Sequence, residues 1–100
     1  MEKVYLRVIS FTFDIDCLQR IKDAFLNVLY NLQIANINFS ELKPYCKIDG
    51  CGEMDIDFQA TQEEIDEIKS LLSDKWEINV TDSRWAKIFC DDITFIGLST

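Results

Sequence analysis

Acidic side chains are concentrated in residues 53–67, which read EMDIDFQATQEEIDE. Seven of these fifteen residues are carboxylates and none is basic. Grouped carboxylates can hold a metal ion, can act as an acid and a base in catalysis, or can form a charged surface for a basic partner. The remaining residues of the chain indicate which of these three kinds of chemistry is available.

The residue types that most enzymes use are scarce in this chain. Histidine is absent, which removes the commonest general base and the commonest neutral metal ligand. No basic cluster surrounds a cysteine to lower the pKa of its thiol, and one C-x4-C spacing has no second pair downstream. We therefore expect inert thiols, no catalytic residue, no metal site and no cofactor. The four cysteines are Cys17, Cys46, Cys51 and Cys90.

The segment 49–57, DGCGEMDID, has the acidity of a calcium loop but not its spacing. Gly50 and Gly52 come too early for the sixth position of such a loop, and Cys51 interrupts the oxygen ligands. The same glycines lack the lysine and the following helix of a phosphate-binding loop. Carboxylates on an outward strand face are solvated, whereas catalytic carboxylates need burial to shift their pKa. The segment therefore predicts a turn and a charged strand surface.

The formal net charge of −8 is unevenly distributed. Residues 1–48 contain five acids and six bases, a net of +1, whereas residues 49–100 contain thirteen acids and four bases, a net of −9. A domain with this charge repels nucleic acid and anionic lipid and attracts cationic proteins. We therefore expect a basic protein partner, no direct nucleic-acid binding and no membrane association.

The first residues, MEKVYLRVISF, lack the features of a secretory signal. An acid stands at position 2, Arg7 interrupts the apolar run, and no small-residue cleavage site follows. No run approaches the roughly 18 apolar residues that a membrane span needs. We expect a cytoplasmic protein whose residues 1–100 form one globular domain.

The first part of the chain predicts a strand and a long helix. Residues 4–13, VYLRVISFTF, are β-branched and aromatic, and their apolar residues on both faces indicate a central strand. Asp14 or Asp16 can cap the following helix, which we expect to end near residues 31–36. Its apolar residues recur at steps of three and four and form one stripe: Leu18, Ile21, Phe25, Val28, Leu29 and Leu32.

A hairpin is predicted next, with arms at residues 45–48 and 53–59. The Asp-Gly-Cys-Gly sequence at 49–52 supplies the positive φ angles that a hairpin turn needs. The second arm alternates between inward apolar and outward acidic side chains, which predicts a half-buried strand. The inward residues are Met54, Ile56 and Phe58, and the outward acids are Glu53, Asp55 and Asp57.

A shorter helix and further strands are predicted in the rest of the chain. Thr61 and Glu64 form a capping box, in which each side chain accepts a hydrogen bond from the other residue's backbone N–H. The apolar stripe of this helix consists of Ile65, Ile68, Leu72 and Trp76. The further strands are predicted at 77–81 and in a second hairpin, with arms at 84–90 and 93–98 and a turn at Asp91 and Asp92.

The predicted order is strand, long helix, hairpin, shorter helix and strands. Because each helix has one apolar stripe, both can pack on one face of a mainly antiparallel sheet. This is an α+β architecture with the βαββαβ order of ferredoxin-like domains, extended by a C-terminal strand or hairpin.

The charge distribution, the small size and the lack of catalytic residues favour a stoichiometric inhibitor of a basic protein, and not an enzyme. Nucleases bind phosphate through Lys and Arg, so an acidic domain can be steered to that surface and block it. An immunity protein that neutralises a nuclease-type toxin fits this description. The predicted partner-binding residues are Glu53, Asp55, Asp57, Glu63, Glu64 and Glu67, with a second patch of Trp85, Asp91 and Asp92; Tyr5, Trp76 and Phe89 are further aromatic candidates.

Three alternatives stay open on the sequence alone. The acids can simply keep the domain soluble and stabilise the start of the second helix. A nucleic-acid mimic of the anti-CRISPR type would use the same charge, spread over a longer acidic ridge. A small regulatory or ligand-binding domain of ferredoxin-like type would dimerise through its sheet. For this chain we expect a monomer or a weak dimer.

Overall fold

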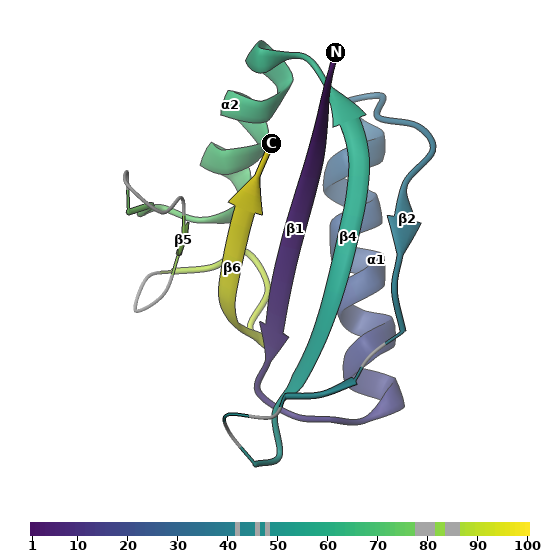
Figure 1. The fold of residues 1–100 in the computed structure, drawn as a ribbon, viewed down its shortest axis with the longest axis vertical. Coiled ribbons are helices and arrows are strands. Elements are labelled where there is room, and N and C mark those ends of the chain that lie inside the picture. Colours follow the sequence, from purple (N-terminus) through teal and green to yellow (C-terminus); the bar gives the residue numbers. More distant parts are fainter. Residues whose placement is uncertain (42, 46, 48, 78–81, 84–86) are drawn as a thin grey trace.

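The computed structural model describes residues 1–100 except residues 42, 46, 48, 78–81 and 84–86. Two helices and six strands are defined within the described residues (Figure 1). In chain order they are β1 (Glu2–Ser10), α1 (Ile15–Asn31), β2 (Asn38–Phe39), β3 (Lys43–Pro44), β4 (Gly52–Ala60), α2 (Gln62–Leu72), β5 (Asp82–Ser83) and β6 (Ile93–Ser99).

The strands form one sheet in the order β2-β4-β1-β6-β5, with β3 also paired to β4, and every pairing is antiparallel. β1 and β4 pair over nine residues each, from Glu2 opposite Ala60 to Ser10 opposite Gly52. Both helices lie behind the sheet, on the same face (Figure 1). The predicted α+β architecture, with two helices on one side of an antiparallel sheet, is confirmed, and neither helix covers the opposite face.

The core lies between the sheet and the two helices. Alternate residues of the long strands point into it, because successive strand side chains project to opposite faces. Each helix contributes one apolar stripe, at the spacing that the sequence predicts. These inward residues are almost completely buried: Val4, Leu6 and Val8 of β1, Met54, Ile56 and Phe58 of β4, Ile21, Phe25 and Leu29 of α1, and Ile65, Ile68 and Leu72 of α2. The predicted inward faces are confirmed for these residues, but Trp76, which was predicted to end the stripe of the second helix, lies beyond α2 and is half-buried.

Side chains cap both helices at their N-termini. Asp14, rather than Asp16, caps α1 and accepts a hydrogen bond from the backbone N–H of Cys17 at 2.8 Å. At α2 the Thr61 hydroxyl accepts from the Glu64 N–H, and the Glu64 carboxylate accepts from the Thr61 N–H at 2.9 Å. The predicted capping box is therefore confirmed, and it satisfies backbone donors that the first turn of a helix leaves unpaired.

Helix α1 ends at Asn31 in a tight reversal of the chain. The Gln33 N–H donates to the Tyr30 carbonyl at 2.9 Å, and the Ile34 N–H donates to the Leu29 carbonyl at 3.0 Å. This pair of bonds defines a Schellman motif. Gln33 consequently adopts a left-handed conformation, with φ of 61°. Glycine is the usual residue at this position, because a Cβ is strained there.

The first hairpin differs from the prediction in its first arm. Among the described residues, the strands that pair with this part of β4 are β2 and β3. The Tyr45 N–H donates to the Cys51 carbonyl at 2.9 Å, and Gly50 between them has φ of 83°, so the turn closes between these residues. Pro44 has no N–H to donate, which a short edge strand such as β3 tolerates. Two residues of the predicted arm lie outside the described part of the chain.

The second hairpin is also rearranged. Residues 93–98 do follow a turn and lie in a strand, β6, which pairs with β1 and at its outer edge with β5. The described part of the other predicted arm, residues 87–90, runs beside the end of α2 instead, where the Phe89 N–H donates to the Leu72 carbonyl at 2.9 Å. The start of that arm, and all but the first residue of the strand predicted at 77–81, lie outside the described residues.

Replacing Gln33 with glycine is expected to stabilise the domain by roughly 0.5–1 kcal/mol, because glycine adopts a positive φ without the Cβ strain. Urea denaturation followed by circular dichroism measures the change in the free energy of unfolding. Gln33→Ala is the matched control, since alanine removes the same side chain and keeps the Cβ. A glycine variant that is no more stable than the alanine variant would contradict the assignment of strain to this residue.

Candidate functional site

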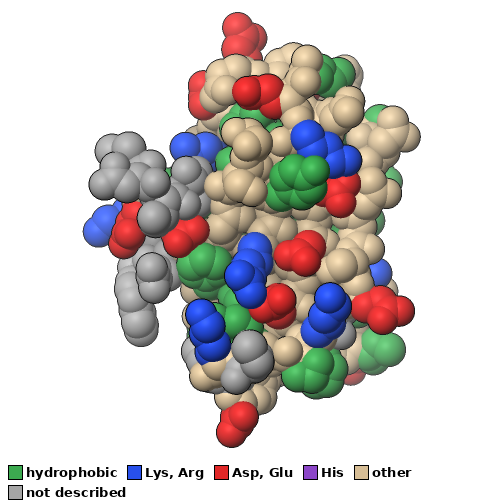
Figure 2. Space-filling view, viewed as in Figure 1, with side chains coloured by type: hydrophobic (Ala, Val, Ile, Leu, Met, Phe, Trp, Pro, Cys, Tyr) green, Lys and Arg blue, Asp and Glu red, His purple; other side chains and the backbone are tan. Residues whose placement is uncertain are grey.

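The outward side chains of the long strands form rows across the sheet. We call this surface the open face; it consists of Lys3, Tyr5 and Arg7 of β1, Glu53, Asp55 and Asp57 of β4, Gly97 of β6 and Asp82 of β5. In the order β4-β1-β6, one row is Asp57, Tyr5 and Ser99, and the next is Asp55, Arg7 and Gly97, which Asp82 extends. Basic, acidic and hydrophobic side chains are intermingled on this side of the molecule (Figure 2).

A shallow groove of about 740 Å³ crosses the open face. Tyr5 lines it and is 51% exposed, which is unusual for a large aromatic residue at the centre of a sheet. Asp55 and Asp57 line it from β4, and Asp82 lines it from β5. The groove thus places an exposed aromatic ring, the kind of residue that anchors protein interfaces, beside three carboxylates.

The acidic stripe of β4 has counter-ions on the neighbouring strand. The Arg7 Nη2 lies 2.7 Å from the Glu53 carboxylate, and the Lys3 Nζ lies 2.9 Å from the Asp57 carboxylate. Arg7 also lies directly opposite Asp55 in the register of the two strands. No base stands between these acids along β4 itself, but the sheet places two bases beside them. Both bases come from β1, which precedes β4 by about fifty residues in the sequence.

These contacts shift the pKa values of the groups involved. The pKa of Asp57 is lowered, first by the hydrogen bond that the Asn38 amide donates and then by Lys3. The pKa of Arg7 is raised, chiefly by its hydrogen bond to Glu53. Because the pKa of Asp57 is lower in the folded chain, its stabilising contribution is present above the unfolded value of about 3.9 and is lost as the pH falls through the folded value.

The two halves of the acidic segment point to opposite sides of the molecule. Glu53, Asp55 and Asp57 project from the open face, whereas Glu63 and Glu67 are exposed on α2, which lies behind the sheet (Figure 1). Glu64, in the same helix, is held in the capping box. The chain passes from one side to the other because α2 starts two residues after β4 and packs its apolar stripe against the covered face. No single surface contains all six predicted carboxylates.

The predicted second patch is divided in a similar way. Asp92 accepts two hydrogen bonds from the Arg20 guanidinium, at 2.8 and 2.9 Å, and Arg20 lowers its pKa. This pair links the turn before β6 to α1. Asp91 is exposed beside it, and Trp85 lies outside the described residues.

Only one of the described aromatic candidates is well exposed. The Phe89 ring packs edge-on against Phe25, with centroids 4.9 Å apart, and the half-buried Trp76 donates its Nε1–H to the Lys69 carbonyl at 2.8 Å. Both residues therefore support the core. Among the described aromatic candidates, Tyr5 is therefore the side chain that a partner can contact.

A second exposed surface, not anticipated from the sequence, lies where β1 leads into α1. Phe11, Phe13 and Ile15 are exposed there, and the last two line a hollow of about 410 Å³ together with Leu18 and Phe39. The available signal was that Phe11 and Phe13 lie beyond the last inward position of the strand. We call this group the apolar patch.

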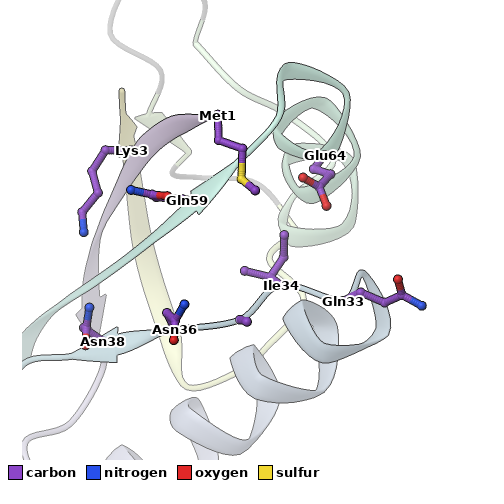
Figure 3. Close-up of a pocket in the computed structure, with 9 residues that line it drawn as sticks. Met1, Lys3, Gln33, Ile34, Asn36, Asn38, Gln59 and Glu64 are labelled. Carbon is purple, nitrogen blue, oxygen red and sulfur yellow. The ribbon is translucent and has the colours of Figure 1, made fainter.

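A third hollow, of about 300 Å³, lies between the end of α1, the start of β1 and the first turn of α2 (Figure 3). Its lining is mainly polar, with four side-chain amides from Gln33, Asn36, Asn38 and Gln59. Its two charged side chains already have partners, because Lys3 pairs with Asp57 and Glu64 accepts from the Thr61 N–H. The hollow therefore offers mainly hydrogen bonds from amide side chains.

The three described cysteines are at least partly buried. Cys17 is buried, Cys51 and Cys90 are half-buried, and burial raises the pKa of the Cys90 thiol, which disfavours the reactive thiolate. Within the described part of the chain, no three carboxylates or thiols are grouped so that they could hold a metal ion. Neither described helix is long and apolar enough to cross a membrane.

No protein-family model matches the chain, and comparisons with curated proteins and with solved structures give no match either. Function is therefore inferred from the chemistry of the chain's own surfaces. Of these, the open face combines a groove of about 740 Å³, an exposed aromatic ring and the predicted carboxylates of β4.

Replacing Lys3 with methionine is expected to raise the pKa of Asp57 toward about 3.9, because the ammonium group favours the ionised carboxylate. NMR titration of the side-chain carboxyl carbon measures this pKa. The shift should be partial, since the Asn38 hydrogen bond remains. Arg7→Met is the matched control: it removes one positive charge from the same strand, but Arg7 bonds Glu53. Equal shifts of the Asp57 pKa in both variants would show that the general positive charge of β1, and not the direct contact with Lys3, lowers this pKa.

Proposed function

We propose that this chain is a small acidic protein-binding inhibitor of the immunity-protein type, which neutralises a basic nuclease-type toxin by covering its active or nucleic-acid-binding surface. The observation that carries the proposal is the open face, where an exposed Tyr5 lies in a groove bordered by Asp55, Asp57 and Asp82. An aromatic anchor surrounded by charged groups is the arrangement of a protein-binding hot spot.

The charge of the chain supports a basic partner. The net charge of −8 attracts a cationic protein over a long range, and this raises the rate of encounter. On the open face the local charges are arranged in pairs, so the contact itself is specific and not merely acidic. Lys3 and Arg7 hold Asp57 and Glu53 in fixed positions, which reduces the ordering that binding would require.

The order of the elements supports a ferredoxin-like arrangement. When β3 and β5 are set aside, the chain runs β1, α1, β2, β4, α2 and β6, and these strands lie side by side in the order β2-β4-β1-β6. We propose a ferredoxin-like βαββαβ domain in which β5 is the additional strand beside β6. A domain of this kind leaves one whole face of its sheet available for a partner.

A nucleic-acid mimic is the second candidate function. The exposed carboxylates of α2, Glu63, Asp66 and Glu67, span only five residues, or about 6 Å along the helix axis at a rise of 1.5 Å per residue. The carboxylates of the open face alternate with bases. Neither surface is a long acidic ridge, which favours the immunity type. The cytoplasmic location stays a prediction.

Replacing Asp55 with lysine is expected to slow association with the basic partner about tenfold and to reduce its salt dependence, because electrostatic steering acts mainly on the association rate. The candidate partners are the products of neighbouring genes. Each is tested for binding at low and high salt and for loss of nuclease activity at a one-to-one ratio. Asp55 is chosen because the other acids of the stripe hold ion pairs.

The matched control is Asp66→Lys, which makes the same change of charge on the exposed side of α2. Equal effects of the two substitutions would mean that net charge, and not the open face, governs binding. Size-exclusion chromatography with light scattering is run alongside. A stable dimer that is broken by changes at Tyr5 would contradict the proposal and would favour a domain that self-associates through its sheet.

A further inference from the structure

We propose that the groove of the open face binds an arginine side chain of the partner, with the guanidinium group held between the Asp82 carboxylate and the Tyr5 ring. The inference rests on the proposed function and names the chemical group that this face recognises. It depends on three features of the groove: the position of Asp82, the exposure of Tyr5 and the distribution of charge.

Gly97 allows the Asp82 carboxylate to lean over β6 toward the centre of the sheet. The two residues are direct partners in the pairing of β5 with β6. A Cβ added to Gly97 would lie 3.1 Å from the Asp82 Oδ1 and 3.4 Å from the Phe95 Cε1. A Cβ at this position would therefore require the carboxylate to shift by a few tenths of an ångström. Glycine here lets the Asp82 carboxylate lie close against β6 at the side of the groove.

Asp82 has no counter-ion among the described residues. The ion pairs of the open face join Lys3 to Asp57 and Arg7 to Glu53, and neither of them involves Asp82. The Asp82 side chain is partly exposed and lines the groove. An ionised carboxylate in such a position can accept two hydrogen bonds from a guanidinium group.

Tyr5 supplies the second contact for a cation. Its ring is 51% exposed in the same groove, and the Lys3 Nζ already lies 5.9 Å from its centroid. Lys3 is bound to Asp57, so it does not extend across the groove. A planar guanidinium can stack flat on a tyrosine ring while its edge donates two parallel hydrogen bonds to a carboxylate, whereas an ammonium group contacts both groups only as a point charge. Arginine is therefore preferred to lysine.

The charges of the open face favour a cationic guest over an anionic or neutral one. Four carboxylates, Glu53, Asp55, Asp57 and Asp82, oppose two bases, Lys3 and Arg7, which leaves a net charge of −2. Arg7, the base of the same row, is bonded to Glu53 at 2.7 Å, and this partly offsets its repulsion of a second cation. The groove thus complements a partner that presents arginine to nucleic-acid phosphates.

The test uses small probes in place of the partner. N-acetyl-arginine methylamide, its lysine analogue and its uncharged citrulline analogue are titrated separately into the nitrogen-15-labelled chain at low ionic strength. Amide shifts are followed by NMR. The arginine probe is expected to move the signals of Tyr5, Gly97, Asp82 and Ser99, to bind more tightly than the lysine probe and to bind much more tightly than the citrulline probe.

Two variants probe the carboxylate independently. Asp82→Asn keeps the shape and removes the charge, and it should weaken arginine binding about tenfold. Gly97→Ala keeps the charge and displaces the carboxylate, and it should also weaken binding; its fold is checked by urea denaturation. Asp66→Asn on α2 is the matched control for loss of one negative charge, and it should leave the affinity within about twofold of wild type.

The proposal would be overturned by shifts that map to α2 or the apolar patch, by equal affinities for the arginine and citrulline probes, or by equal losses in Asp82→Asn and Asp66→Asn. Its failure is distinguishable from failure of the proposed function. A neighbouring gene product that binds the open face, together with no arginine binding in the groove, would remove this inference and leave the inhibitor role standing.

Discussion

The antiparallel pairing of β1 with β4 is the constraint on which the rest of the structure depends. It runs over nine residues of each strand and fixes which side chains face the helices and which face outward. A slip of one residue would exchange the two faces, because strand side chains alternate with a period of two. If β4 slipped by one residue against β1, Met54 would meet water and Asp55 would meet the core. Burial of the apolar set therefore holds the register.

The same register determines the electrostatics of the open face. Once Leu6 lies opposite Ile56 on the inward side, Tyr5 must lie opposite Asp57 and Arg7 opposite Asp55 on the outward side. Lys3 and Arg7 of β1 then each pair with an acid of β4 that lies two residues from the directly opposite position. The strong field of the whole chain and the paired charges of this face are thus separate properties. The first attracts a cationic partner from a distance, and the second gives the contact its pattern.

The arrangement of the helices gives the domain two different sides. Both helices bury their apolar stripes on one face of the sheet, so that face forms the hydrophobic core. The other face needs no cover, because ion pairs, amides and one exposed tyrosine make it compatible with water. The short strand β5 and the glycine opposite it complete a groove across this face. The proposed inhibitor role depends on this groove and on the side chains that line it.

The sequence by itself determined the features that depend on neighbours within a few residues. These include the inward faces of β1 and β4, the apolar stripes of both helices, the Thr61 capping box and the general α+β architecture, because periodicity and capping are local properties. Strands of two residues, such as β2, β3 and β5, carry no period and were missed or misplaced. Only the tertiary structure decided that Lys3 and Arg7 neutralise the stripe of β4, that Glu63 and Glu67 lie on the other side of the sheet, and that Asp82 leans over Gly97. Each of these depends on which distant segments become neighbours, and that choice is made by burial of the whole core rather than by any one segment.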